Sequence, residues 1–254
     1  MYCLGTVSWN GYIERYIDIF ATNYIRLYRR LIAFGVNYKD IADPLIYYMN
    51  DEIGPVAKEA IKRIEIATGK KLQFIQDKDG YSVEKVMYTT RNGLRNAFRK
   101  LYPKEKKVFF YFPIDDNIRI EAALELIKLH KATEPTACMF KFLVEEPKDR
   151  YTAATRPINS YKDIHHGDWG GYCAYNILNE NECPLYPSID IPNIAFYANL
   201  YKAGYKEYQS KEICVDHLRH LDSHHYKYKN TAMAKRVKNY LDAQINELRE
   251  KGYK

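Results

Sequence analysis

The sequence predicts an α/β protein whose mixed, mainly parallel sheet is covered by helices on both faces. Four apolar segments in the first half of the chain alternate with amphipathic helical segments, which is the order of parallel strands joined by helical crossovers. The apolar segments are nearly continuous, as in strands buried on both faces. Three of the four end in Asn or Asp, so polar groups are expected at one edge of the sheet, where such sheets bind ligands.

The four expected strands are short apolar runs that end at turn residues. They cover residues 2–9, 45–49, 72–75 and 108–114. The last of them, VFFYFPI, is the strongest strand signal in the chain, and two acidic residues follow it directly.

The expected helices carry apolar residues at steps of three and four, which places those residues on one helix face. Proline is tolerated in a first helical turn, and glycine favours helix ends. The helices run from Ile13 to Gly35, from Pro55 to Gly69, around residues 94–101 and from Glu121 onwards.

The second half of the chain is organised differently. Residues 145–190 contain repeated Gly and Pro turn signals without a long periodic segment, which indicates loops that build a pocket. A helix is expected over 194–201 and a short strand over 213–215. Residues 231–254 predict an amphipathic C-terminal helix, which packs on the domain, forms a homodimer contact or touches an anionic membrane. No repeat or linker interrupts residues 1–230, which we expect to form a single domain.

The charge of the chain favours acidic partners. Lys and Arg number 39 against 32 Asp and Glu, and the net charge of +7 suits phosphates, nucleic acid or an anionic membrane face. The absence of a long Lys/Arg run argues against nucleic acid. The 25 tyrosines indicate either a surface that stacks on sugars or a bias of composition.

The cysteines and the hydropathy pattern indicate a cytoplasmic protein. Five cysteines without a CxxC pair argue against a disulfide framework or a zinc ribbon and fit a reducing compartment. We see neither a signal peptide nor an apolar stretch of the roughly 20 residues that a membrane span needs. The protein is expected in solution or at the inner face of the membrane.

Asp115-Asp116-Asn117 is the sharpest candidate site. It follows the most apolar segment, and burying charge without a partner is costly, so such a pair of carboxylates holds a hard cation or faces solvent. Oxygen ligands suit Mn²⁺ or Mg²⁺, which would bridge the two phosphates of a nucleotide. The alternative is an acidic turn in which Asp115 or Asn117 caps a helix.

Two further groups of residues could carry chemistry. His217 and His220 belong to a cluster that extends to His225, and a zinc site with Cys214 would need a spacing that fits none of the usual ligand patterns. Residues 167–171, GDWGG, place an aromatic side chain between glycines, which suits sugar stacking and loop closure. A plain hairpin turn is the alternative.

Residues 91–127, RNGLRNAFRKLYPKEKKVFFYFPIDDNIRIEAALELI, resemble the core of family-2-like GT-A glycosyltransferases. That family shows an N-x-G-L-x-x-A helix, an apolar strand, a D-x-D-type acidic motif and a further helix. TVSWN at 6–10 and LIYYMNDEIG at 45–54 resemble the family's first two strands. Residues 189–220 resemble its later arrangement of acidic residue, helix, K-A-G-Y, strand and histidine.

The resemblance implies the GT-A fold, which is Rossmann-like and nucleotide-binding. Residues 1–120 would form the nucleotide-sugar-binding half and residues 121–230 the acceptor-binding half. The implied activity is that of a hexosyltransferase-type glycosyltransferase. It would move a sugar from a UDP- or GDP-sugar to a hydroxyl of a saccharide, lipid or protein acceptor, with inversion and with the help of Mn²⁺ or Mg²⁺.

The resemblance also assigns residues to the donor. Val7 and Ser8 would line the nucleoside, and Asn50 or Asp51 would hydrogen-bond the base. Arg91 falls near the position that faces the phosphates, where the family usually has asparagine.

For the metal, Asp115 and Asn117 would flank the ion with Asp116 between them, and His217 or its rival His220 would complete the site. The neutral Asn117 departs from a full acidic triad and predicts a lower metal affinity.

For catalysis, Asp190 matches the general base, although Ile189 stands where the family often has another acid. Asp168 is the alternative base. Trp169, Gly170 and Gly171 are the candidates for acceptor binding.

Two other functions compete with a glycosyltransferase. A nucleotidyltransferase would need a phosphate-binding glycine-rich loop after the first strand, where the sequence has the single Gly11. A non-catalytic module that binds nucleic acid or a protein partner would explain the positive charge and the tyrosines.

Overall fold

The computed structural model describes residues 1–9, 12–49, 51–77, 86–103, 106–145, 151–154, 173–178, 200 and 202–218. Within these ranges the strands form one sheet in the order β3-β2-β1-β4-β8-β6-β9-β5, with β7 beside β6. The strands are β1 (Tyr2–Trp9), β2 (Leu45–Met49), β3 (Gln73–Gln76), β4 (Lys107–Tyr111), β5 (Asn117–Ile118), β6 (Thr136–Glu145), β7 (Tyr151–Ala154), β8 (Cys173–Ile177) and β9 (Lys206–Leu218).

The direction of the strands confirms a mixed, mainly parallel sheet. β3, β2, β1 and β4 are parallel to one another. β8 runs antiparallel to both β4 and β6, so β6 has the direction of the first four strands, and β9 is parallel to β6. Among the described strands, only β5, β7 and β8 run the other way.

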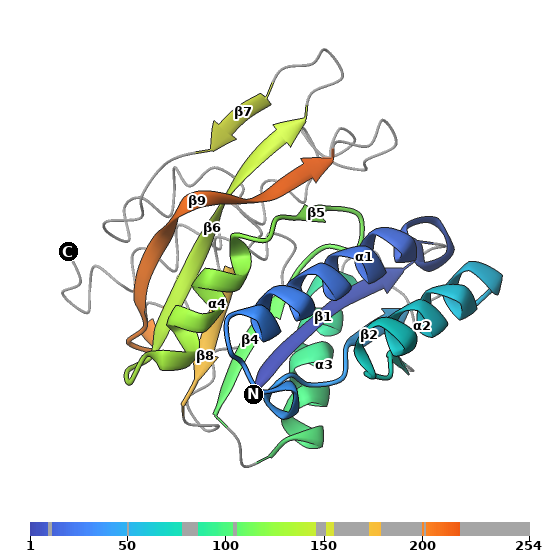
Figure 1. Ribbon diagram of the computed structural model, residues 1–254, viewed down its shortest axis with the longest axis horizontal. Helices are drawn as coiled ribbons and strands as arrows, with labels where there is room; N and C mark the ends of the chain where they lie inside the picture. The colour runs from blue at the N-terminus through green and yellow to red at the C-terminus, as the bar shows by residue number, and fades with distance from the viewer. Residues whose placement is uncertain are drawn as a thin grey trace.

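Helices cover both faces of the sheet, as the sequence predicts (Figure 1). The described helices are α1 (Tyr12–Ala33), α2 (Pro55–Thr68), α3 (Val86–Leu101) and α4 (Ala122–Lys131). Leu4 and Phe110 point to the face that carries α1, α2 and α4, whereas Cys3 and Phe109 point to the face that carries α3. This alternation follows from the pleat of a strand, in which successive side chains leave on opposite sides.

Three residues explain where helices α2 and α3 lie. Pro55 opens α2, and Gly69 ends it with a φ of 69° and an N–H that donates to the Glu65 carbonyl. Gly5 lets α3 approach β1, because a Cβ there would lie 2.9 Å from both Leu94 and Phe98. The predicted helix ends at Pro55 and Gly69 are therefore confirmed.

The second half differs from its sequence-based prediction. β7 and β8 lie inside residues 145–190, where only loops were expected, and β9 is much longer than residues 213–215. Residues 206–212 of β9 are mostly charged or polar and hold their place through pairing with β6, so the apolar run at 213–215 marks only part of the strand. The expected helix over 194–201, apart from residue 200, and the C-terminal helix at 231–254 lie outside the described residues. None of the described helices has the length and apolar character needed to cross a bilayer.

Glu207 places a carboxyl group inside the second half of the sheet. Both carboxylate oxygens are buried and have no hydrogen-bond partner among the described residues. Burial raises the pKa of this carboxyl to about 8. Burial also raises the pKa of the neighbouring Cys173 thiol, and the charge of Glu207 adds to that rise.

Glu207→Gln is expected to make stability less dependent on pH. The pKa of Glu207 is about 8 in the folded state, against 4.5 for a free side chain. The protonated carboxyl therefore contributes fully to folding stability below pH 4.5, and this contribution is lost as the pH rises through 8. The variant should therefore unfold at higher urea concentration than the wild type at pH 9. Glu212→Gln, at an exposed position of the same strand, is the control. An unchanged pH dependence in Glu207→Gln would contradict the burial of an uncompensated carboxyl group.

Candidate functional site

The predicted site residues that the structure describes lie at or near the carboxyl edge of the sheet. Val7 and Ser8 are close to the end of β1, and Asp51 follows β2. Asp115 and Asp116 lie between β4 and β5. Val7 is buried in the core cluster that also contains Leu94 of α3.

Asp51 joins the end of β2 to the start of α1. Its Oδ2 accepts hydrogen bonds from the Ser8 hydroxyl at 2.7 Å and from the Ile13 amide at 3.1 Å. Its Oδ1 accepts from the Glu52 amide at 3.0 Å. A carboxylate at a helix N-terminus satisfies a free amide and faces the positive end of the helix dipole. Asp51 therefore links the end of β1, at Ser8, to the first turn of α1, at Ile13.

Glu14 places a carboxylate at the N-terminus of α2 in the same way, although no sequence pattern marks it. Its carboxylate accepts from the amides of Gly54 at 2.8 Å, Val56 at 3.1 Å and Ala57 at 3.0 Å. Gly54 is the residue that allows this, because a Cβ there would lie 2.6 Å from the Glu14 carboxyl carbon. The N-termini of α1 and α2 thus both face carboxylates of the chain itself.

Arg91 and the two acidic residues gather around Tyr111 at the end of β4. Arg91 is 5% exposed, its guanidinium carbon lies 4.4 Å from the centroid of the Tyr111 ring, and its Nη2 donates to the Tyr111 hydroxyl at 3.4 Å. Burial is the main cause that raises the pKa of this hydroxyl. The charge of Arg91 opposes the rise, and the charges of Asp115 and Asp116 add to it. The structure therefore brings three predicted donor-site residues together.

Tyr47 is a further residue of this edge that sequence reasoning missed. It lies beside Val7 in the register of β1 and β2. A Cβ on Gly93 of α3 would lie 2.3 Å from the Tyr47 ring, so the ring packs directly on the helix that carries Arg91. The signal that could have found it is the glycine in an otherwise regular helix, since a helical glycine often marks a close contact.

Residues 115–117, here called the acidic turn, are held in place by a side chain of α1. Asp116 is fully buried, whereas Asp115 is half-buried. The Asn23 side chain donates to the Asp116 carbonyl at 2.6 Å, and its Oδ1 accepts from the Ile118 amide at 3.0 Å. Asn23 was not among the predicted residues, although a polar residue on the apolar face of a helix is a visible signal.

Asn117 takes part in a chain of polar contacts. Its Oδ1 accepts from Arg26 at 3.1 Å, and its Nδ2 donates to Asp216 at 2.8 Å. Asp216 also forms an ion pair with Arg119 at 2.7 Å. The register of β5 and β9 pairs Asn117 with Asp216, so His217 follows directly in the strand beside the acidic turn.

Two adjacent carboxylates suit the coordination of Mg²⁺ or Mn²⁺. Among the described residues, no group of three or more His, Cys, Asp and Glu side chains gathers as in a complete metal site. A cation at Asp115 and Asp116 would therefore need further ligands from a bound diphosphate or from outside these ranges. Burial raises the pKa of the Cys214 thiol to about 11, which disfavours the thiolate that a zinc site would need.

The remaining predicted residues lie outside the described part of the chain. These are Asn50, Asp168, Trp169, Gly170, Gly171, Asp190 and His220. For these residues, base contact, acceptor binding, general base and metal ligation stay predictions.

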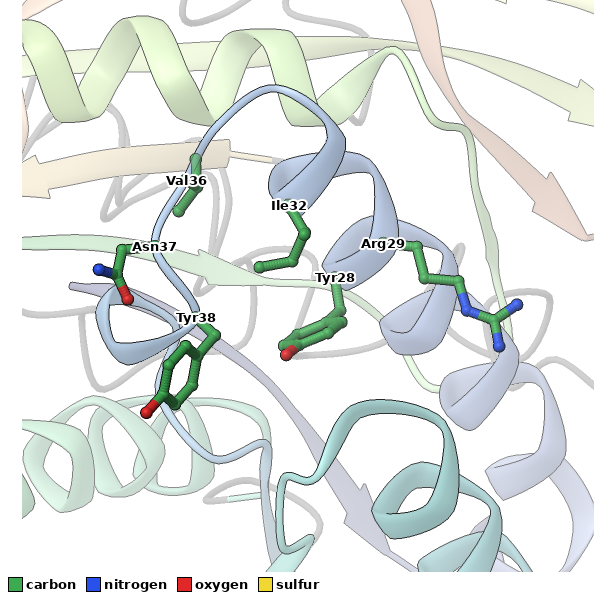
Figure 2. A pocket seen from close by; sticks show the side chains of 6 residues that line it. All are labelled: Tyr28, Arg29, Ile32, Val36, Asn37 and Tyr38. Carbon is green, nitrogen blue, oxygen red and sulfur yellow. The ribbon is translucent and has the colours of Figure 1, made fainter.

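A pocket at the other end of α1 is separate from the acidic turn. Its volume is about 560 Å³, and its lining comes from the second half of α1 and the residues that follow it (Figure 2). The lining residues are Tyr28, Arg29, Ile32, Val36, Asn37 and Tyr38. This segment returns to the start of β1, where the Ala42 amide donates to the Tyr2 carbonyl. The pocket thus lies toward the edge of the sheet opposite the candidate site.

Glu14→Ala is expected to lower the free energy of unfolding by about 1–2 kcal/mol, the usual cost of losing a helix cap. Glu59→Ala, at an exposed position of α2, is the control and should change it by less than about 0.5 kcal/mol. Urea unfolding measures both. Equal stability of the two variants would contradict the capping role.

Comparison with known proteins shows the fold. Neither the protein-family models nor the curated proteins give a match. Among solved structures, S. aureus TarS 1–349 is similar with a TM-score of 0.57 at 11% identity, over 85% of this chain and 60% of TarS. The mannosyltransferase PcManGT from Pyrobaculum calidifontis, solved with GDP-Man and Mn²⁺, gives 0.57 at 10% identity, over 89% of this chain and 59% of PcManGT. The chain thus spans about three fifths of the length of these proteins, and its fold is that of the GT-A glycosyltransferases.

Proposed function

We propose that the chain is a hexosyltransferase-type glycosyltransferase that uses a nucleoside-diphosphate sugar as donor. The observation that carries the proposal is the group of Arg91, Asp115 and Asp116 around Tyr111, at the edge of a GT-A sheet where α/β proteins bind ligands. A solved neighbour of the same fold contains GDP-Man and Mn²⁺, which supports a donor of this class.

The capped helices define how a diphosphate would be bound. A helix N-terminus is a ready anion site, but the N-termini of α1 and α2 face Asp51 and Glu14. We therefore assign the charge of a diphosphate to Arg91 and to a divalent cation at Asp115 and Asp116, with His217 or His220 as a further ligand. Bound Mn²⁺ or Mg²⁺ would stabilise the negative charge of the leaving nucleoside diphosphate. The same capping disfavours a nucleotidyltransferase that holds phosphates at the helix after β1.

The nucleoside would lie over the ends of β1 and β2. We assign it to Val7, Ser8, Asn50 and Asp51. Asp51 accepts hydrogen bonds from Ser8 and from the start of α1. It would therefore both contact the base and hold these neighbouring residues in position. Because Tyr47 lies between this edge and α3, its ring adds an aromatic surface beside the nucleoside.

In the transfer step, Asp190 accepts the proton of the acceptor hydroxyl while the oxygen of that hydroxyl attacks the anomeric carbon. The bond between that carbon and the diphosphate oxygen breaks, and the configuration inverts. Trp169, Gly170 and Gly171 would hold the acceptor, a saccharide, lipid or protein hydroxyl, and Asp168 is the alternative base.

Nucleotide binding tests the donor site. The wild-type protein is expected to bind UDP or GDP at least about tenfold more tightly with MnCl₂ than with EDTA in isothermal titration, and to hydrolyse the matching sugar nucleotide slowly. Asp116→Asn should remove the gain from Mn²⁺, because a neutral amide is the weaker ligand. Arg91→Gln should weaken binding with and without the metal. Failure of the wild type to bind or hydrolyse any member of a panel of UDP- and GDP-sugars would overturn the proposal.

Asp190→Asn tests the base. Donor affinity is expected to stay within about twofold of the wild type, while transfer to a competent acceptor falls by a factor of about 10² to 10⁴. Transfer at the wild-type rate would instead assign the base to Asp168 or another residue. Initial rates at saturating donor distinguish these outcomes.

A further inference from the structure

We propose that α1 positions the acidic turn through Asn23, and that Asn117 belongs to this support and is not a metal ligand. The inference rests on the proposed donor site and concerns the orientation of the Asp115 and Asp116 carboxylates. β5 lies next to α1, so the helix and the turn are direct neighbours (Figure 1).

Asn23 is a buried amide in an apolar setting. It is 1% exposed and sits on the α1 face that also buries Phe20 and Leu27. A buried amide is costly unless its hydrogen bonds are made, and here both its oxygen and its nitrogen bond to backbone. The two partners, the Asp116 carbonyl and the Ile118 amide, lie on either side of Asn117. One side chain therefore fixes the backbone across the whole turn.

Asn117 extends the same support outward. Arg26 lies one helical turn after Asn23, and both reach the acidic turn from α1. Each polar atom of the Asn117 amide has a protein partner, Arg26 on the oxygen and Asp216 on the nitrogen. A metal ion at the Asn117 oxygen would share that oxygen with Arg26, and the two cations would repel each other.

The support also fixes the backbone from which Asp116 projects. Asn117 points to α1, where Arg26 donates to its side-chain oxygen. The charge of Asp116 adds to the rise in the pKa of Tyr111, at the end of β4. Because Asn23 holds both the Asp116 carbonyl and the Ile118 amide, it restricts how the backbone can turn at Asn117.

Asp216 is the one other carboxylate that a described contact brings to the turn, and it is engaged elsewhere. Both of its oxygens accept hydrogen bonds, from Asn117 on one and from Arg119 on the other. We therefore assign a cation at the turn to Asp115 and Asp116 and not to Asp216.

Asn176 provides a matched control. It too is fully buried, and its amide also bridges two backbone groups, the Thr136 amide at 2.8 Å and the Glu134 carbonyl at 2.9 Å. It lies in β8, away from the acidic turn. Asn23→Leu and Asn176→Leu therefore remove the same kind of interaction and should reduce thermal stability by similar amounts.

The decisive measurement is Mn²⁺ affinity by electron paramagnetic resonance, in the presence of UDP or GDP. Asn23→Leu is expected to weaken Mn²⁺ binding at least about tenfold and to change the spectrum of the bound ion, whereas Asn176→Leu should stay within about twofold of the wild type. Asn117→Asp distinguishes the two roles, because it changes the Mn²⁺ affinity in opposite directions. If residue 117 is a metal ligand, the variant should bind Mn²⁺ more tightly. If the residue is part of the support, binding should weaken, because the added negative charge would face Asp216.

Wild-type binding together with unchanged affinity in Asn23→Leu, or tighter binding in Asn117→Asp, would overturn the inference and leave the proposed function in place. Equal losses in Asn23→Leu and Asn176→Leu would reduce Asn23 to a stabilising residue and also overturn it. Absence of Mn²⁺ and nucleotide binding by the wild type would overturn both proposals.

Discussion

Asp51 and Glu14 place carboxylates at the N-termini of α1 and α2, and these two contacts constrain the whole carboxyl edge of the sheet. They satisfy amides that would otherwise be free, and they oppose the positive ends of both helix dipoles. An anionic ligand at this edge therefore meets a carboxylate at each of these two helix N-termini. Side-chain cations and ions offset that negative charge, which gives weight to the positions of Arg91 and of the acidic turn.

Helix α1 serves both stability and the site. Its apolar face buries residues such as Phe20 and Leu27 against the sheet, and the same face carries Asn23. The apolar packing fixes the height and rotation of the helix. Two hydrogen bonds from one amide then transmit that placement to the backbone on both sides of Asn117. The packing of α1 in the core therefore determines the position of the acidic turn, as a site built on rigid elements requires.

The first half of the fold could be predicted because its signals are local. Parallel strands buried on both faces are continuous apolar runs, and Pro55 and Gly69 punctuate α2 at its two ends. The second half could not be predicted in this way, because β9 is polar in composition and exists through pairing with β6. For the site, the sequence predicts residues such as Asp51, Arg91 and the acidic motif, but not the contacts that position them. The contact of Glu14 with Gly54 spans 40 residues and that of Asn23 with Asp116 spans 93, and no local pattern encodes such pairs.

The charges around Tyr111 explain why a metal and Arg91 belong to one mechanism under the proposed function. Arg91 contributes +1 and the two aspartates contribute −2, so the group carries −1 before any ion is bound. Tyr111 adds no charge at neutral pH, because burial raises the pKa of its hydroxyl further above 10. In that state the group as a whole would repel a diphosphate, although Arg91 itself attracts it. A divalent cation changes the sum to +1, so Arg91 and the bound ion would together attract the phosphates.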